Sequence, residues 1–448
     1  MKPLLSVLCL LPLSGSLDAA PVAAASDDII AVRDFIKGSW EKTFRSNDRD
    51  EGSLIGLPKP YAVPSIAGNF QEMYYWDTYF TGEGLLLDGH ADMAANNVEN
   101  MVYLVGLYGK MPNGNRTHFE NRSQPPYLGM MVESVYKKTG DKDWLRRVLP
   151  GLQAEYHFWM TRRLTPCGLN RYSSEGTLAN RERIVGILKK RLGEKFQQQT
   201  AGYSRVDVSR AGGHFIAEAE SGWDFTPRFQ MRCEDFCPVD LNANLYYYEK
   251  NFEYSLRELG KPEEAEAWAE KADRRKALMR KYLRDDETGL YYDYDFVNDR
   301  RSDVVSAAVF SLMYARILDA DEAAALREKA LAALEYPHGI ATCAERDYGF
   351  TYQWSFPNAW APLQYLAIRG LDNYGFSHDA RRIAGKYVAM VANTYKTTNN
   401  LWEKYNVVEG NVNVTNEYKM PPMMGWTAGI FVWTDEYLRQ QTDGLDTQ

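Results

Sequence analysis

The chain has 448 residues, of which 45% are hydrophobic and 25% charged, and its formal net charge is −8. These values are typical of a soluble globular protein, and the length suffices for a large core. An acidic chain without a basic patch does not fit a nucleic-acid-binding protein, because phosphate binding requires clustered Lys and Arg side chains. The short basic run Lys189–Arg191 lies in a mixed-charge segment and indicates a solvated face.

The N-terminus has the pattern of a secretory signal. Lys2 supplies a positive charge, residues 4–13 form a short apolar stretch, and residues 20–25 offer small side chains for cleavage. The apolar stretch is too short to span a membrane, and no later stretch is long enough. The sequence therefore predicts a signal peptide over residues 1–25 and a mature protein that is periplasmic or secreted.

Apolar residues recur at helical spacing along most of the remaining chain. The predicted helices span Asp28–Phe44, Trp76–Leu87, Met93–Leu107, Tyr127–Lys138, Asp143–Arg162, Asp240–Leu259, Pro262–Tyr282, Val304–Ile317, Ala320–Leu334, Asn358–Ile368, His378–Tyr395 and Trp426–Arg439. Few segments alternate as strands do, and Thr288–Phe296 is the best candidate. About a dozen helices joined by loops predict an all-α fold, a toroid of paired antiparallel helices.

Several segments between these helices are distinctive. The highly charged stretch Glu175–Gly213 is expected to be an excursion with one or two extra helices. The loops Pro58–Phe70 and Trp402–Pro422 are long, and long ordered loops in a compact domain are usually functional. No Ser- or Pro-rich linker divides the chain. We therefore expect one domain over residues 26–442, followed by a tail of residues 443–448.

Removal of the signal peptide leaves four cysteines, at positions 167, 233, 237 and 343. An even number in an exported protein permits disulfides without requiring them. Cys233 and Cys237 bracket three residues and could close a small loop, while buried free thiols are an equal alternative. No His lies at ligand spacing from these two cysteines, so the sequence predicts no metal site.

Asp224 is the first candidate for acid–base chemistry. It lies between Trp223 and Phe225 and follows Gly222, which permits close approach of backbone or ligand. A carboxyl group in an apolar pocket has a raised pKa, which a general acid working near neutral pH requires. The alternative is that Asp224 simply caps a turn or helix that starts near Thr226.

Two glutamates near the C-terminus could supply a second carboxyl group. Glu403 precedes Lys404, and the alternative for this pair is a surface ion pair worth little. Glu417 lies 14 positions later, across a loop. Trp354 could be a platform for a sugar ring, with Trp360 as a core residue. Paired carboxyl groups fit glycosidic hydrolysis, where one protonates the departing oxygen and the other activates water or attacks.

Six motifs in one order resemble the trehalase family, glycoside hydrolase family 37. They are Glu72, Tyr74, Trp76, Asp77 and Tyr79 of a first signature, PNGNR with RSQPP within 112–126, ESGWDFTPR at 220–228, VDLN at 239–242, QWSFPNAWAPLQ at 353–364 and EKYNV at 403–407. The matches run from about residue 68 to 430, nearly the whole mature chain. One such motif is a weak signal, but six in order are highly specific.

The resemblance implies an (α/α)6 barrel with the site in its mouth and no metal or organic cofactor. It implies Asp224 as general acid and Glu403 as general base of an inverting reaction, with their carboxyl groups about 6.5–9.5 Å apart. It further implies sugar contacts by Trp76, Asp77, Asn113, Arg122, Ser123, Gln124, Gly222 and Glu417, to which we add the platform Trp354.

Some positions depart from the family pattern. Asn69 stands where the first signature has Arg, Ser355 stands where the QWD motif has Asp, and the R-P-E segment is not recognisable near residues 180–182. Losing one charge-assisted contact to a sugar costs about 1.5–3 kcal/mol. The acid and base motifs persist, so hydrolysis of an α-glucosidic bond is a firmer expectation than the particular substrate.

The expected function is inverting hydrolysis of an α-glucosidic disaccharide, with α,α-trehalose as the expected substrate. One alternative is a related α-glycosidase of the same fold with a different aglycone. Another is a catalytically inactive sugar-binding protein, which the retention of two carboxyl groups disfavours. The expected partner is a small sugar, bound by a monomer without nucleic acid or membrane.

Overall fold

The structure is a computed structural model that describes residues 26–416 and 418–443. The predicted signal peptide, most of the predicted tail and Glu417 lie outside the described residues. The helices are α1 (Ser26–Lys37), α2 (Tyr75–Leu87), α3 (Ala91–Tyr108), α4 (Leu128–Thr139), α5 (Lys142–Arg162), α6 (Leu178–Arg191), α7 (Gly193–Thr200), α8 (Arg205–Glu220), α9 (Val239–Glu258), α10 (Pro262–Leu283), α11 (Phe310–Tyr314), α12 (Ala320–Leu334), α13 (Ala361–Asn373), α14 (Ser377–Thr398) and α15 (Gly425–Asp443). The strands are β1 (Phe44–Arg45), β2 (Tyr61–Ala62), β3 (Phe236–Cys237), β4 (Tyr294–Asp295), β5 (Arg300–Arg301), β6 (Glu335–Tyr336), β7 (Gly339–Ile340), β8 (Asn358–Trp360) and β9 (Lys404–Asn406).

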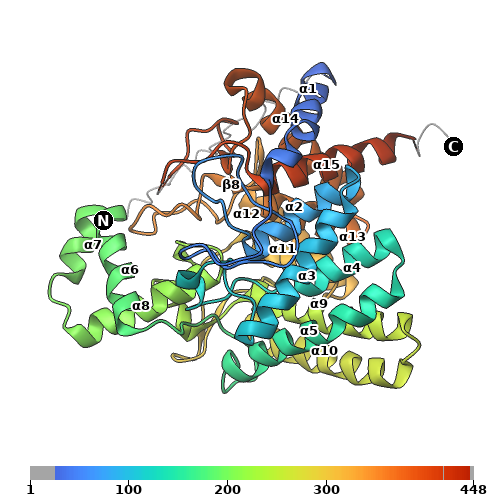
Figure 1. The fold of residues 1–448 in the computed structure, drawn as a ribbon. Helices are drawn as coiled ribbons and strands as arrows, with labels where there is room; N and C mark the ends of the chain where they lie inside the picture. Colours follow the sequence, from blue (N-terminus) through green and yellow to red (C-terminus); the bar gives the residue numbers. More distant parts are fainter. Residues whose placement is uncertain (1–25, 417, 444–448) are drawn as a thin grey trace, which may run out of the picture.

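Six helices form a closed inner ring. Helix α2 packs against α4, α4 against α9, α9 against α11, α11 against α13 and α13 against α15, which returns to α2. Helices α3, α5, α10 and α14 pack around the outside of this ring, and α1 packs on α14 (Figure 1). The expected (α/α)6 barrel is therefore confirmed. None of the helices in the described part of the chain is both long and apolar enough to cross a membrane.

The ring closes where α2 meets α15, and two glycines permit this contact. A Cβ atom on Gly84 of α2 would lie 2.5 Å from the Cα atom of Gly429 on α15. A Cβ atom on Gly429 would in turn lie 2.2 Å from the carbonyl oxygen of Phe80. The two helices thus touch backbone to backbone, which any larger side chain at these positions would prevent.

A short strand and an isolated β-bridge replace the first residues of two predicted helices. The helix predicted from Asn358 begins only at Ala361, because residues 358–360 form β8 and pair antiparallel with β9. The helix predicted from Val304 is reduced to a 3₁₀ turn and α11, because Ser306 pairs with Cys343 in an extended bridge. In both places backbone hydrogen bonds to distant residues replace those of a helical turn.

The remaining differences are at the first helix and the predicted strand. Helix α1 ends at Lys37 instead of Phe44, and the chain continues through a 3₁₀ turn into β1. Of the predicted strand Thr288–Phe296, only Tyr294–Asp295 is a strand, the central one of the three-stranded sheet β3-β4-β5. Pairs of two residues are too short to form a second layer, so the helices determine the architecture.

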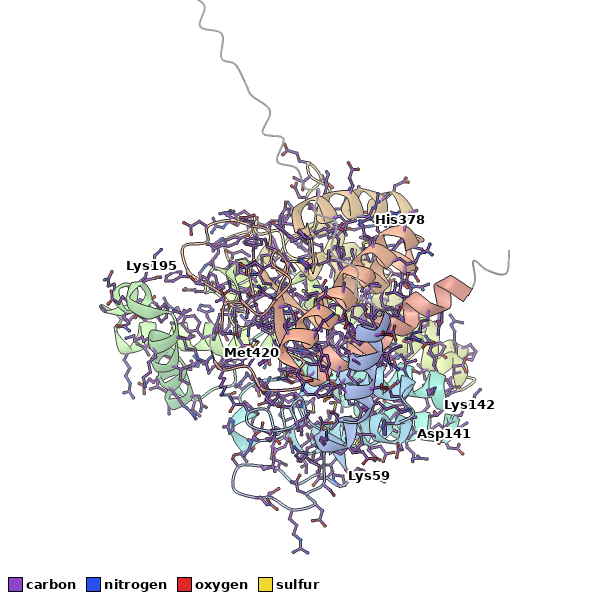
Figure 2. The ribbon with its side chains drawn as sticks, turned by 90° about the horizontal axis from the view of Figure 1, so that it is seen from above. Lys59, Asp141, Lys142, Lys195, His378 and Met420 are labelled. Carbon is purple, nitrogen blue, oxygen red and sulfur yellow. The ribbon has the colours of Figure 1, made fainter. Side chains whose placement is uncertain are left out.

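The charged stretch 175–213 forms α6, α7 and the first half of α8, one helix more than the upper expectation. These helices project from the barrel, and Lys195 on α7 lies at the outer edge of the projection (Figures 1 and 2). A separate apolar cluster holds the projection against the barrel. Its buried members are Val185, Leu188, Phe196, Phe215, Phe225 and Tyr352.

Candidate active site

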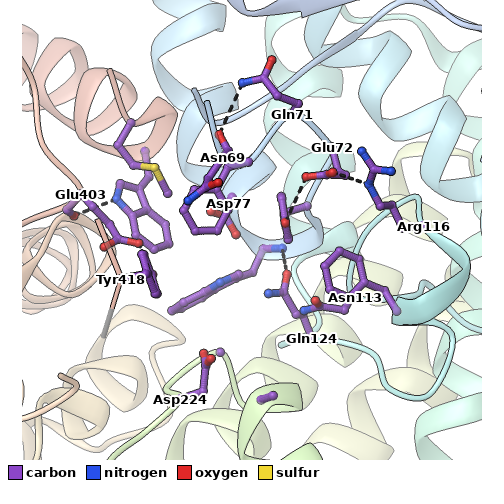
Figure 3. A pocket seen from close by; sticks show the side chains of 18 of the residues that line it. Asn69, Gln71, Glu72, Asp77, Asn113, Arg116, Gln124, Asp224, Glu403 and Tyr418 are labelled. Carbon is purple, nitrogen blue, oxygen red and sulfur yellow. Dashed lines mark hydrogen bonds and ion pairs between the residues drawn. The ribbon is translucent and has the colours of Figure 1, made fainter. Parts of the chain in front are cut away.

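A cavity of about 520 Å³ lies at the N-terminal ends of α2, α13 and α15. This volume is within the range of small-molecule sites, about 300–1,000 Å³. Both predicted catalytic carboxyl groups point into the cavity from different walls (Figure 3). The predicted residues that line it are Trp76, Asp77, Asn113, Arg122, Gln124, Gly222, Asp224, Trp354 and Glu403.

The loop after α8 presents Asp224 to the cavity. Gly222 has a φ angle of 74°, and a Cβ atom there would lie 2.8 Å from the indole ring of Trp76. Glycine therefore lets this loop pack directly on the aromatic wall. Across the loop, the backbone N–H of Trp354 donates to the carbonyl oxygen of Phe225 at 3.1 Å. The position of Asp224 is thus fixed by backbone contacts on both sides.

Asp224 is not a helix cap. The following 3₁₀ turn is capped by Thr226, whose hydroxyl accepts from the backbone N–H of Arg228, so the capping interpretation is wrong. The Asp224 carboxyl is partly exposed to the cavity, and desolvation by the surrounding walls raises its pKa to about 6. The positive charges of Arg191 and Arg122 oppose this rise. A carboxyl group with this pKa is roughly one-tenth protonated at pH 7, far more than an ordinary aspartic acid.

Glu403 is held at the edge of β9 by three hydrogen bonds. Its Oε2 atom accepts from Lys404 Nζ at 2.6 Å, its Oε1 atom accepts from the Tyr418 hydroxyl, and its carbonyl oxygen accepts from the Trp426 indole at 3.0 Å. Glu403 and Lys404 are only 1% and 0% exposed. The interpretation of this pair as a surface ion pair is therefore wrong, since both partners are buried.

A chain of polar contacts joins the two carboxyl-bearing segments. Lys404 Nζ also donates to Gln353 Oε1 at 3.3 Å, and Gln353 Nε2 donates to the carbonyl oxygen of Asp224 at 2.6 Å. The antiparallel pairing of β8 with β9 places residues 358–360 beside residues 404–406, and Gln353, which precedes β8, thereby comes within reach of Lys404. The sequence motifs contain Lys404 and Gln353, but their bridging position follows only from this strand pairing.

Asp77 is a third carboxyl group in the cavity. It lies in the first turn of α2 and is 6% exposed. Desolvation raises its pKa to about 8, and the charges of Glu403 and Asp224 add to the rise. Near neutral pH Asp77 is mostly protonated, so it can donate as well as accept hydrogen bonds. Such a group suits a sugar hydroxyl, which also does both.

Aromatic rings form the apolar wall. Trp354 stacks on Trp360 with ring centroids 3.7 Å apart and an interplanar angle of 1°, and Trp76 lies 5.6 Å from Trp354. Both Trp354 and Trp360 line the cavity, so Trp360 is more than the core residue that was predicted. Flat ring faces beside polar groups match the apolar C–H face and polar rim of a pyranose.

The opposite wall is polar. Arg122 Nη2 donates to Asn113 Oδ1 at 3.3 Å, while its buried Nε atom has no protein partner. Gln124 Oε1 accepts from the backbone N–H of Trp76 at 3.2 Å, which ties this wall to α2. Arg122 therefore keeps one buried donor without a protein partner, which costs free energy.

Ser123 does not line the cavity, in contrast to its predicted sugar contact. It is fully buried, its N–H donates to Glu220 Oε1 at 2.7 Å, and its hydroxyl donates to the carbonyl oxygen of Met111 at 2.6 Å. Glu220 also forms a two-point ion pair with Arg163. Ser123 therefore supports the polar wall from behind, and its hydroxyl is already used.

Several cavity residues were missed, Tyr418 and Arg191 among them, and one departure from the family pattern does not line the cavity. Tyr418 and Arg191 line the cavity, and Arg191, which belongs to the basic run interpreted as a solvated face, is exposed at the cavity mouth. No motif marks either residue in the sequence. Of the departures at single positions, Asn69 lines the cavity while Ser355 is not among the lining residues. Residues 26–416 and 418–443 hold no group of three or more His, Cys, Asp or Glu arranged to bind a metal ion.

Comparisons with known proteins identify similar sequences and structures. The family model described as Trehalase matches residues 25–437. The periplasmic trehalase of Salmonella paratyphi B is 34% identical over 426 residues, covering 89% of this chain and 72% of the relative. Neutral trehalase Nth1 from Saccharomyces cerevisiae is 29% identical with a TM-score of 0.72, covering 90% of this chain and 80% of that chain. A GH63 mannosylglycerate hydrolase from Thermus thermophilus, 18% identical with a TM-score of 0.61, covers 90% and 100% and shares the fold.

Proposed function

The chain belongs to the trehalase family, and from this we propose that it hydrolyses α,α-trehalose to two glucose molecules with inversion. The observation that carries the proposal is one cavity that presents Asp224 and Glu403 beside a tryptophan platform. The Salmonella relatives are named periplasmic trehalases, so we assign this chain to the periplasm as well. It acts as a monomer on a small sugar, without nucleic acid or membrane as partner.

Asp224 is the general acid and Glu403 the general base of the proposed reaction. The raised pKa of Asp224 keeps a proton available for the departing glycosidic oxygen. The Lys404 ammonium and the Tyr418 hydroxyl both donate to Glu403, which fixes the orientation of its carboxyl group. As the base, Glu403 takes a proton from water while the water attacks the anomeric carbon.

The other lining residues bind the sugar or orient the residues that bind it. Trp354 supports the apolar face of the reacting glucose, and protonated Asp77 and the Arg122 guanidinium bind its hydroxyls. Asn113 orients Arg122. The other proposed sugar contacts are Trp76, Gln124, Gly222 and Glu417. Ser123 keeps only its supporting position.

The anomeric composition of the product tests this function. Inversion converts one glucose of α,α-trehalose to the β-anomer, while the departing glucose keeps its α-configuration. Proton NMR in the first minutes of digestion is expected to show equal amounts of α- and β-glucose. Release of α-glucose alone would contradict inversion. Glucose release from another disaccharide of a panel, with none from trehalose, would contradict the proposed substrate.

A further inference from the structure

The projection formed by α6, α7 and α8 contributes a charged group to the cavity. Arg191, the last residue of α6, lines the cavity mouth, where its guanidinium carbon lies 5.9 Å from the ring centroid of Tyr418. Tyr418 in turn donates to Glu403. On the other side, the charge of Arg191 acts on Asp224 more strongly than that of Arg122. Arg191 is therefore within electrostatic reach of both carboxyl-bearing walls.

The packing of α6 against the barrel fixes the position of Arg191. Val185 and Leu188, on the same helix, are buried in the apolar cluster with Phe225 and Tyr352. Phe225 follows Asp224 in the chain, and Tyr352 precedes Gln353. Asn180 completes a capping box with Thr177 at the start of the helix. The helix that carries Arg191 is thus packed on the segments that hold the acid.

From this placement we infer that Arg191 binds the leaving-group sugar and belongs to the substrate site. The inference rests on the proposed function, because a leaving group exists only if a glycosidic bond is cleaved. A guanidinium at the mouth donates to vicinal sugar hydroxyls through two parallel N–H groups. The same charge also tunes the neighbouring acid, so one side chain couples substrate binding to protonation.

The variant Arg191→Gln tests both effects. It is expected to raise KM for trehalose about 10-fold, the loss of one exposed charge-assisted contact. Removing a cation disfavours the ionised Asp224 carboxylate, so the pKa of Asp224 rises and the alkaline limb of kcat/KM moves to higher pH, by about half a unit. Arg191→Lys keeps the charge and is expected to leave this limb in place. Arg183→Gln, an exposed arginine on the same helix outside the cavity lining, is the matched control.

A KM within twofold of the unmodified enzyme for Arg191→Gln would overturn the inference, as would an equal effect of Arg183→Gln. The substrate is whichever glycoside the unmodified enzyme cleaves. If that enzyme does not act on trehalose, the proposed function fails on its own, and Arg191 is then tested with the glycoside that is cleaved.

A different observation supports a second inference, about two cysteines. All four cysteines of the described residues are thiols, and Cys237 on β3 has Cys167 as its sulfur neighbour, not Cys233. The Sγ atoms of Cys167 and Cys237 are 3.7 Å apart, and the Thr165 hydroxyl lies 3.1 Å and 3.5 Å from them. A disulfide needs an S–S distance of about 2.05 Å, so bond formation requires the two neighbouring Sγ atoms to approach further.

We infer that Cys167 and Cys237 are joined by a disulfide in the protein folded in an oxidising compartment. The oxidant is an external disulfide, as thiol-oxidising proteins or glutathione disulfide supply. The Cys167 thiolate attacks one donor sulfur and expels the other as a thiolate. Cys237 then loses its proton and attacks Cys167 Sγ, expelling the second donor thiolate. Two cysteines are oxidised, and one donor disulfide is reduced to two thiols.

The surroundings of the two thiols determine which of them reacts first. Contact with the Cys237 thiol lowers the pKa of the Cys167 thiol to about 6, whereas burial raises the pKa of Cys237. Cys167 is also the more exposed of the two, so it is the nucleophile that meets the donor. The segment closed by the bond contains α6, α7, α8 and the loop with Asp224.

Alkylation and mass spectrometry of protein exported to the periplasm test the bond. The expected result is a peptide pair linked through Cys167 and Cys237, with Cys233 and Cys343 alkylated only after denaturation because both are fully buried. Reduction is expected to lower the unfolding temperature by about 3–6 °C in the unmodified chain and to leave Cys167→Ala/Cys237→Ala unchanged. Alkylation of Cys167 and Cys237 as free thiols, or a link between other cysteines, would overturn the inference.

Discussion

Replacing the proposed general acid by its amide, Asp224→Asn, is expected to lower kcat/KM for trehalose by about 10³-fold. The amide cannot donate a proton to the glycosidic oxygen, so the departing glucose must leave as an unstable alkoxide. The fold should persist, because Gln353 donates to the backbone carbonyl oxygen of Asp224. The Asp224 side chain takes no part in this hydrogen bond. Initial rates of glucose release and the unfolding temperature measure the two effects.

A substrate that needs no acid provides the control for this variant. Fluoride leaves without protonation, so Asp224→Asn is expected to hydrolyse α-D-glucosyl fluoride within about 10-fold of the unmodified enzyme. An equal loss on trehalose and on the fluoride would mean that Asp224 does not act as the acid. Asp77→Asn is a useful comparison, because it removes a neighbouring carboxyl of raised pKa that binds sugar in our proposal. This variant should lower the rate of hydrolysis of both substrates to the same extent.

The helices were largely predictable because apolar periodicity reports one buried face of each helix. Their closure into a ring was not, because it depends on contacts such as Gly84 with Gly429, which are far apart in the chain. The family resemblance supplied that topology. The predicted helix boundaries were wrong where the backbone pairs with a residue far away in the chain. Examples are Ser306 with Cys343 and the pairing of β8 with β9. Local propensity cannot anticipate such pairs.

The site was predictable where a motif carried it and not where geometry alone did. Asp224 and Glu403 stand in distinctive strings of residues. Arg191 does not, and it reaches the cavity only because Val185 and Leu188 anchor the helix on Phe225. Ser123 is the opposite case, because it lies within a matching motif but does not face the cavity. Its hydroxyl donates to the carbonyl oxygen of Met111. A motif marks a segment, and only packing decides which of its side chains face the substrate.

The variant Glu403→Gln is expected to lower kcat for trehalose by about 10³-fold as well. It should reduce hydrolysis of α-D-glucosyl fluoride to the same extent, because both substrates require activated water. This pattern distinguishes the base from the acid. Stability is a complication here, since Lys404 stays buried after its anionic partner is lost. The free energy of unfolding is expected to fall by up to about 3 kcal/mol.

The double variant Glu403→Gln/Lys404→Met separates catalysis from stability. It removes the unpaired ammonium, so the unfolding temperature should recover while activity stays low. Recovery of activity together with stability would mean that Glu403 is structural. Azide gives a second criterion, because Glu403→Ala leaves space for a small anion that can attack the anomeric carbon and form β-glucosyl azide. If Glu417→Gln proves more damaging than Glu403→Gln, and only Glu417→Ala yields the azide product, the base is Glu417. The buried ion pair with Lys404 would then stabilise the loop without activating water.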